Sequence, residues 1–342
     1  MDLSPSDEQR SIVTSVAEFL AEKMPTSTVR QLRDVDLGTL SDFWTSAAAQ
    51  GWFGLGLDEE LGGAGYGLVD EALLFKEIGR FLTPGPVVAT TLAARVAALG
   101  KHGDLAADIL SGAVPVGLAV PQPGTEPLES GKVTGGYDLL DAKHTSYVLV
   151  SAPSGSALVA ASDCSDRQDA LPIDDVGSRE TCSFDTDAAV YVPTEVEDLY
   201  SRGVVLTTAV LAGICEATRD MATGYAKTRE QFGRPIGAFQ SIKHRCADMA
   251  VGADAAGAAL LFAALSLAEG REDAAFQVAA ARIVAEQRAL WSSRENIQVH
   301  GGMGFTAECD AHLYLKRTHL LGQTFGGVRG AQADLLTQAA AQ

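Results

Sequence analysis

The sequence has little of what several specialised protein classes require. Aromatic residues make up 6% of its 342 residues, and its five cysteines, at positions 164, 182, 215, 246 and 309, form no CxxC pair. An odd number of widely spaced cysteines indicates reduced thiols in a cytoplasmic protein and predicts no metal site. No run of about 18 apolar residues lacks a polar break, so no transmembrane span is expected. The N-terminus also lacks the basic region of a secretory signal.

Positive charge is scarce as well. The chain has 26 Lys and Arg against 44 Asp and Glu, a formal net charge of −18, which argues against binding to nucleic acids or acidic membranes. One segment differs, because residues 227–245 contain five basic residues and Glu230 as their only acidic neighbour. The basic residues are Lys227, Arg229, Arg234, Lys243 and Arg245. Such a segment suits a small anionic ligand or a solvated helix face, and charge alone does not separate the two.

The pattern of residue types changes twice along the chain. Residues 1–112 have helical periodicity, and residues 113–198 consist of short β-branched or aromatic runs divided by Gly, Pro, Asp and Ser. Residues 199–342 return to long helices, expected at 203–229, 240–269, 272–299, 309–321 and 328–341. The pattern predicts a helical domain, then a small antiparallel barrel or sandwich, then a helical domain.

Two adjacent glycines, Gly326 and Gly327, separate the last two predicted helices. Glycine destabilises helix interiors and permits positive φ, so the pair predicts a tight turn or the close approach of a ligand.

Three stretches resemble the acyl-CoA dehydrogenase family. They are GWFGLGLDEELGGAGYGLVDEALLFKEIGR (51–80), YAKTREQFGRPIGAFQSIKHRCADM (225–249) and QVHGGMGFTAECDAHLYLKR (298–317). The resemblance covers essentially the whole chain. It implies an α+β fold with an N-terminal helical domain, a middle β-barrel or sandwich, and a C-terminal four-helix bundle.

The family binds FAD, with the flavin ring in one subunit and the adenosine and pyrophosphate end reaching its neighbour. The resemblance implies that Arg229 binds the pyrophosphate, because arginine makes bidentate bonds to phosphate oxygens. The full set of positions carried over for this half-site is Arg229, Phe232, Gln240, Gln298, Gly301 and Gly302. Gln231 and Phe239 depart from the Thr or Ser and the His that the family usually has there, which puts those hydrogen bonds in doubt.

The family's catalytic base, a glutamate that removes the α-proton of an acyl-CoA thioester, has no counterpart in its usual place. The alignment puts Gly326 at the base position and Val328 where a hydroxyl usually contacts flavin. The base position of other members, at the start of the first C-terminal helix, falls on Gly203 and Val204. The nearest carboxylates, Glu195, Glu197 and Asp198, are alternatives whose register the sequence leaves open.

The middle domain also departs from the family. Residues 118–124 have no Thr or Ser before the proline turn, and residues 137–150 contain no Trp to lie beside the flavin ring. These losses on the ring side contrast with the retained adenosine side.

Three hypotheses follow from that contrast. The chain is a self-sufficient dehydrogenase with an unrecognised base, a subunit that donates its half-site to a base-bearing paralogous partner, or a family member repurposed for another reaction or as a scaffold. The pattern favours the partner subunit and resembles the short, degenerate subunit of actinobacterial α2β2 enzymes that dehydrogenate steroid side-chain CoA thioesters.

Overall fold

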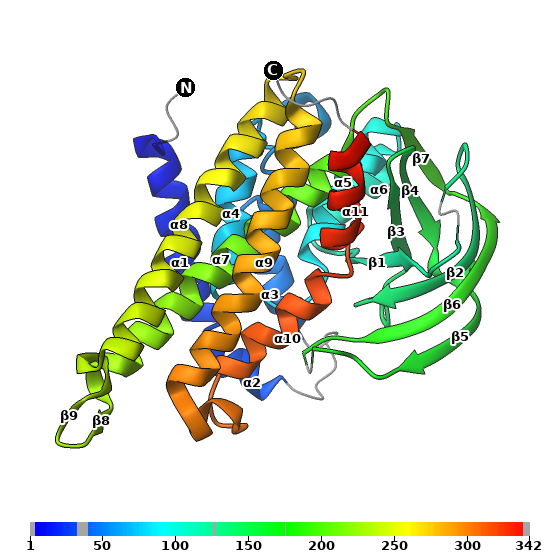
Figure 1. The fold of residues 1–342 in the computed structure, drawn as a ribbon. Helices are drawn as coiled ribbons and strands as arrows, with labels where there is room; N and C mark the ends of the chain where they lie inside the picture. The colour runs from blue at the N-terminus through cyan, green and yellow to red at the C-terminus, as the bar shows by residue number, and fades with distance from the viewer. Residues whose placement is uncertain (1–3, 33–39, 126–127, 175, 338–342) are drawn as a thin grey trace. The chain divides into compact units, whose positions relative to one another are not determined.

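The N-terminal part of the described chain is helical, as the ribbon in Figure 1 shows. The computed structural model describes residues 4–32, 40–125, 128–174 and 176–337. Ser6 and Gln9 form a reciprocal capping box that fixes the start of α1. The helices are α1 (Asp7–Lys23), α2 (Thr26–Gln31), α3 (Ser41–Ala49), α4 (Leu68–Arg80), α5 (Val87–Leu99) and α6 (Gly103–Leu110), with 3-10 turns η2 (Trp52–Gly54) and η3 (Glu59–Leu61).

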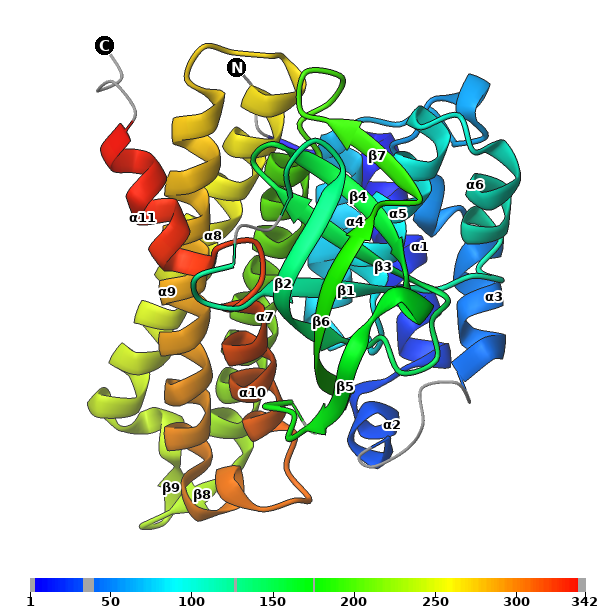
Figure 2. The ribbon, with the colours of Figure 1, turned by 90° about the vertical axis from the view of Figure 1, so that its right-hand side faces the viewer.

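The middle of the chain folds into one seven-stranded sheet with the strand order β5-β6-β2-β1-β3-β4-β7. Figure 2 shows its curvature, with β5 and β7 at the two ends of that order. All neighbouring strands are antiparallel except β1 and β3, which pair in parallel. The strands are β1 (Val116–Pro121), β2 (Lys132–Leu140), β3 (Tyr147–Ala152), β4 (Gly155–Ala160), β5 (Ser165–Ala170), β6 (Arg179–Asp187) and β7 (Val190–Pro193), with turn η4 (Ala161–Asp163) after β4.

Long helices occupy the C-terminal part of the chain. All five predicted helices are present with their ends moved by a few residues, although the predicted end at 341 lies outside the described residues. They are α7 (Leu199–Thr228), α8 (Gln240–Ala268), α9 (Ala274–His300), α10 (Ala311–Leu321) and α11 (Gly327–Thr337). Between them lie β8 (Glu230–Gln231), β9 (Arg234–Pro235), η5 (Ile236–Ala238) and η6 (Gly301–Phe305).

By its internal contacts the chain divides into two compact units. Unit 1 comprises Met1–Gln31, Ala72–Thr83 and Val205–Gln342, and unit 2 comprises Leu32–Glu71 and Pro84–Val204. In unit 2, α5 packs against β1, β3, β4 and β7, and the strands have a core that includes Tyr137 and Phe184, both almost fully buried. In unit 1, α8 and α9 pack closely along their lengths. Three domains bounded at 112 and 198 remain a prediction.

Within unit 1, α4 and α7 cross at very short range through two glycines. A Cβ atom added to Gly213 would lie 1.9 Å from the carbonyl oxygen of Lys76, and one added to Gly79 would lie 2.1 Å from that of Val210. Each glycine faces the backbone of the other helix, so only the absence of side chains permits this approach.

Two helices are long and apolar enough to cross a membrane by length and composition. They are α7 and α8, with mean hydropathies of 1.2 and 1.8 over their most apolar windows, of which 78% and 39% is buried. The sequence predicted no such segment because polar residues interrupt both. The same criteria are met by core helices of proteins that contain no membrane span, so they do not identify one here.

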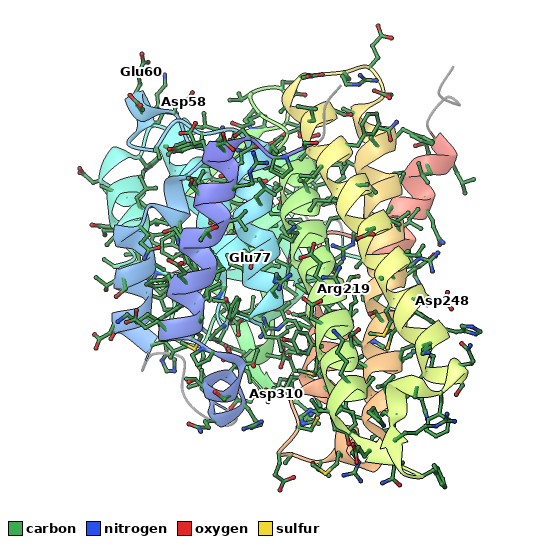
Figure 3. All side chains as sticks on the ribbon, turned by 90° about the vertical axis from the view of Figure 1, so that its left-hand side faces the viewer. Asp58, Glu60, Glu77, Arg219, Asp248 and Asp310 are labelled. Atoms are coloured by element: carbon green, nitrogen blue, oxygen red, sulfur yellow. The ribbon has the colours of Figure 1, made fainter. Side chains whose placement is uncertain are left out.

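The outer side of α8 carries an exposed carboxylate. Asp248, on α8, points away from the helices in Figure 3.

Candidate functional site

A short β-hairpin follows α7 and carries part of the basic segment. β8 and β9 pair antiparallel, with Gln231 opposite Arg234. The two turn residues, Phe232 and Gly233, have φ values of 53° and 74°. Positive φ at both positions defines a type I′ turn, which matches the twist of a hairpin and usually contains Asn-Gly. Phenylalanine in this conformation is strained, and such strain concentrates at functional sites.

The predicted half-site residues lie in unit 1, where α7 ends, α8 begins and α9 ends (Figure 1). An apolar cluster that includes Ala226, Met249 and Val299 packs these three helix ends together. Tyr225 and His300 stack with their ring centroids 4.3 Å apart, which joins the end of α7 to the end of α9. The structure thus brings the two sequence motifs to one end of the helices.

The half-site presents its side chains to the outside of the described chain. Arg229, Phe232, Gln240 and Gln298 are exposed, and the exposed fraction of Phe232 reaches 91%. Although its edge meets the ring of Phe239, an aromatic ring this exposed on a strained turn contributes little to the packing of its own chain.

Three glycines after α9 have different reasons for being glycine. Gly301 adopts φ 61° and ψ −138° at the helix end, a conformation that L side chains rarely adopt. A Cβ added to Gly304 would lie 2.6 Å from the carbonyl oxygen of Ile297, so packing within the chain requires that glycine. A Cβ added to Gly302 would meet nothing within 4 Å. Nothing in the described chain therefore restricts the exposed residue 302 to glycine.

The basic residues of segment 227–245 are not equivalent. Arg245 forms an ion pair with Glu295, so its charge is neutralised within the chain. Among the residues that the structure describes, no carboxylate pairs with Lys227, Arg229 or Arg234. Arg229, directly after α7, and Arg234, on β9, therefore present guanidinium groups that are available to an anion.

The turn at the predicted base position is held by a fully buried arginine. Arg282, on α9, donates hydrogen bonds to the carbonyl oxygens of Leu321 at 2.6 Å and Thr324 at 3.3 Å. Its Nε donates to a carboxylate oxygen of Glu286 at 3.0 Å. A Cβ added to Gly327 would lie 2.1 Å from the carbonyl oxygen of Gly322, so glycine is required there by the turn itself.

Three successive residues in this turn have positive φ. The values are 49° for Phe325, 75° for Gly326 and 55° for Gly327. Gly326 is exposed and carries no proton-accepting group, and Val328 supplies no hydroxyl. Glu286, the carboxylate next to the turn, is bound to Arg282.

The alternative carboxylates before α7 are in unit 2. Glu197 accepts hydrogen bonds from Arg95 at 2.5 Å and from Arg202 at 3.3 Å. Asp198 accepts the backbone N–H of Ser201 at 2.9 Å, in the role of a helix cap. Glu195 is exposed. Two of the three carboxylates thus have structural partners.

Arg202 itself is bound to a buried glutamate. Its Nη2 lies 2.6 Å from Oε2 of Glu71, whose side chain is 2% exposed. The other carboxylate oxygen of Glu71 accepts the backbone N–H of Gly56 at 3.1 Å. These contacts connect the start of α7 to the glycine-rich motif at 51–80. The sequence analysis identified that motif but predicted no contact for it.

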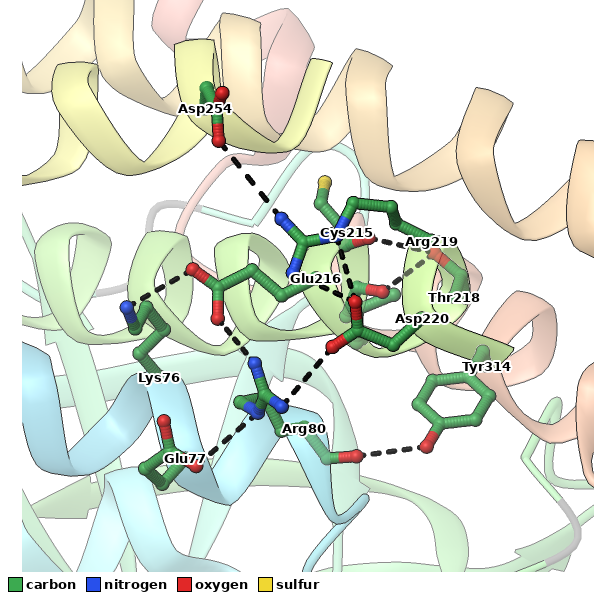
Figure 4. A network of polar contacts seen from close by, with 11 residues as sticks. Lys76, Glu77, Arg80, Cys215, Glu216, Thr218, Arg219, Asp220, Asp254 and Tyr314 are labelled. Carbon is green, nitrogen blue, oxygen red and sulfur yellow. Dashed lines mark hydrogen bonds and ion pairs between the residues drawn. The ribbon is translucent and has the colours of Figure 1, made fainter. Parts of the chain in front are cut away.

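Sequence reasoning also missed a partly buried ion network between α4 and α7, drawn in Figure 4. Glu216 lies 3.1 Å from Lys76 and 2.6 Å from Arg80, and Arg80 also contacts Glu77 and Asp220 at 3.3 Å each. Basic residues four apart on one helix and acidic residues four apart on the other were the available signal. The charges satisfy one another, which indicates a structural role.

Comparisons with known proteins agree with the motifs. The acyl-CoA dehydrogenase N-terminal domain model matches residues 6–106, and the C-terminal domain model matches residues 201–341. The acyl-CoA dehydrogenase IpdE2 of Mycobacterium tuberculosis is 31% identical over 93% of this chain and 92% of its own length. The acyl-CoA dehydrogenase FadE34 of the same organism is 33% identical over 86% of this chain, which spans only 43% of that relative.

Solved structures share the fold over nearly the whole chain. The ChsE4-ChsE5 complex from Mycobacterium tuberculosis contains a chain that is 24% identical with a TM-score of 0.87, covering 99% of this chain and 100% of that one. A variant of the Tcur3481-Tcur3483 steroid ACAD is 22% identical with a TM-score of 0.85, covering 96% of each chain. The two domain models and the full-length similarity to IpdE2 lead to one conclusion: the chain belongs to the acyl-CoA dehydrogenase family.

Proposed function

We propose that this chain is the non-catalytic subunit of a heteromeric, flavin-dependent acyl-CoA dehydrogenase. It donates the half-site of Arg229, Phe232, Gln240, Gln298, Gly301 and Gly302 to a flavin whose ring lies in a base-bearing paralogous subunit. The observation that carries the proposal is a contrast within unit 1. The half-site is exposed and includes an unpaired arginine, whereas the base position is an exposed glycine in a turn held by Arg282.

The described residues fit the adenosine and pyrophosphate end of FAD. Arg229 offers an unpaired guanidinium to the pyrophosphate, and Phe232 offers an exposed ring to the adenine. The open surroundings of Gly302 leave room for a ligand to approach the backbone. FAD, when bound, supplies the acceptor for the hydride that leaves the β-carbon of the acyl group.

The substrate class and the assembly are part of the proposal. We include in it a CoA thioester of a steroid side chain as substrate, an α2β2 assembly and a cytoplasmic location. A paralogous partner is supported by the similarity to chains from the ChsE4-ChsE5 complex and from Tcur3481-Tcur3483, and the steroid class by the description of the latter as a steroid ACAD. In such an assembly half of the usual acyl sites are absent, which leaves space for a bulky polycyclic acyl group.

The experiment that tests this proposal compares the chain alone with the chain co-expressed with a full-length, base-bearing homologue. We expect the chain alone to be nearly free of flavin, and the copurified complex to contain flavin and to reduce an electron acceptor when given acyl-CoA. Flavin content, native mass and acceptor reduction are measured on both samples. A yellow, active homo-oligomer of this chain alone would instead establish a self-sufficient dehydrogenase.

Arg229→Ala in the complex tests the donated half-site directly. Losing a charge-assisted bond to pyrophosphate is expected to weaken FAD binding by about 2 kcal/mol, close to 30-fold. Flavin retention after dilution is the measurement. Arg271→Ala is the matched control, because Arg271 is an exposed arginine beyond the other end of α8 and pairs with Asp273. Unchanged flavin retention in Arg229→Ala would show that this half-site is not donated.

Restoring a carboxylate at residue 326 is expected not to restore catalysis. Glutamate at Gly326 would need φ near 75°, between two further residues of positive φ, at a cost of about 1 kcal/mol. We expect Gly326→Glu to lower the unfolding midpoint and to give the chain alone no acyl-CoA-dependent acceptor reduction. Gly330→Glu is the control, since residue 330 lies within α11 and a Cβ there meets nothing within 4 Å. Turnover by Gly326→Glu alone would mean that the turn lacked only its carboxylate.

A further inference from the structure

One aromatic ring in the hairpin region is shared by two other side chains. The guanidinium carbon of Arg234 lies 4.1 Å from the centroid of the Phe239 ring, within range of a cation–π contact. The Phe232 ring meets the same ring edge-on, with centroids 6.1 Å apart and an interplanar angle of 83°. Phe239 immediately precedes α8, so the ring stands on the end of a long helix.

Arg234 keeps its charge available. Its side chain belongs to an exposed residue, and no carboxylate of the described ranges pairs with it. Arg271 provides a contrast within the same unit. It lies 5.5 Å from the centroid of the Phe262 ring but is also bound to Asp273 at 2.9 Å. The carboxylate of Asp273 neutralises Arg271, whereas the partner of Arg234 is the uncharged ring of Phe239.

We propose that Arg234, held by Phe239, is a second arginine for the diphosphate of the bound dinucleotide. This inference rests on the proposed function and extends it. Arg234 pairs with Gln231 across the hairpin, and Gln231 lies two residues after Arg229, so the hairpin keeps the backbones of both arginines close. Two guanidinium groups suit the two phosphate groups of one diphosphate.

The role assigned to Phe239 follows from what its ring is able to do. Phenylalanine has no hydrogen-bond donor, so it makes no hydrogen bond to a phosphate oxygen. It does restrict the rotamers of an exposed arginine, which reduces the entropy lost when that arginine binds a ligand. Phe239 is therefore a positioning residue that acts through Arg234, and the departure from histidine noted in the sequence is compensated by a neighbouring cation.

The test measures FAD affinity in the complex with its base-bearing partner after the flavin has been removed. Arg234→Ala is expected to weaken FAD binding about tenfold, from the loss of a charge-assisted hydrogen bond. Phe239→Leu is expected to weaken it about threefold, and Phe239→Tyr, which keeps a ring, to retain most of the affinity. Riboflavin lacks both phosphates and the adenosine of FAD, so its affinity should be the same in all variants. Arg271→Ala should bind FAD like the unmodified chain.

The double variant Arg234→Ala/Phe239→Leu separates positioning from independent effects. If Phe239 acts through Arg234, the double variant binds FAD no more weakly than Arg234→Ala alone. Additive losses would refute the positioning role. Unchanged FAD affinity in Arg234→Ala, with Arg229→Ala impaired, would overturn this inference and leave the proposed function standing. Unchanged affinity in Arg229→Ala would instead overturn the proposed function.

Discussion

Gly213→Ala is expected to lower the free energy of unfolding of the chain by about 3 kcal/mol, enough to reduce the yield of folded protein. The added Cβ would lie 1.9 Å from the carbonyl oxygen of Lys76, a backbone atom that does not rotate away. The contact that α4 makes through its own glycine is equally close, because a Cβ on Gly79 would lie 2.1 Å from the carbonyl oxygen of Val210. Relief would require α4 and α7 to separate, which would disturb the ion network around Glu216.

The measurement is urea denaturation of the purified chain, followed by circular dichroism. Gly257→Ala is the matched control, because residue 257 lies within α8 and its Cβ would meet nothing within 4 Å. Alanine is a better helix former than glycine by about 1 kcal/mol, so this control should be as stable as the unmodified chain or more so. Equal stability of the two variants would show that the crossing of α4 and α7 is looser than described.

The same substitution is expected to have very different effects on stability at two glutamates of the ion network in Figure 4. Burial favours a higher pKa for Glu216, but the charges and hydrogen bonds of Lys76 and Arg80 outweigh it and hold the pKa below its ordinary value. Burial raises the pKa of Glu77, and Arg80 and Lys76 offset only part of that effect. Glu216→Gln should therefore cost about 3 kcal/mol at pH 7, whereas Glu77→Gln should cost less than about 1 kcal/mol or stabilise the fold.

The pH dependence has opposite signs at the two sites. The lowered pKa of Glu216 means that its stabilising contribution is present above the unfolded-state pKa of about 4.3 and is lost as the pH falls through the folded-state value. The raised pKa of Glu77 means that ionisation weakens the fold above the folded-state pKa, and that this penalty disappears as the pH falls toward the unfolded-state value.

Denaturation curves for both variants at pH 7 and at pH 4 test these signs. The stability difference between Glu216→Gln and the unmodified chain should shrink at pH 4, and any advantage of Glu77→Gln should shrink as well. Similar losses of stability in the two variants at pH 7 would contradict the assignment, because they would mean that both carboxylates stabilise the fold through Arg80.

Helical periodicity was sufficient to predict the C-terminal helices, because their apolar residues recur at a fixed spacing over many turns. The sheet was less accessible. Short β-branched and aromatic runs located the β region. They carried no information on the pairing of β1 with β3, which are parallel and separated by β2 in the chain. Short strands that are buried on both faces lack the alternation that would identify a neighbour, so their register depends on tertiary contacts.

Some features of the candidate site could likewise be predicted from the sequence, and others could not. A motif was enough to nominate Arg229 and to find glycine at residue 326, since both depend on position in the chain. The contact between Arg234 and Phe239 was not predicted, because a cation–π contact requires side-chain geometry that no spacing rule supplies. The role of Arg282 was hidden as well. In sequence it is one polar residue of a helix, and its complete burial against the turn after α10 depends on packing between distant segments.

Gly302 and Gly304 are two residues apart on the same 3-10 turn, yet they differ in what a substitution would disclose. Alanine at residue 304 meets the backbone of Ile297 at 2.6 Å, so it disturbs the polypeptide whether or not anything is bound. Alanine at residue 302 meets no atom of the described chain within 4 Å. A mutational scan of this turn would therefore contain two separate kinds of information. Intolerance at residue 304 reports on folding, and intolerance at residue 302 reports on what the folded chain binds.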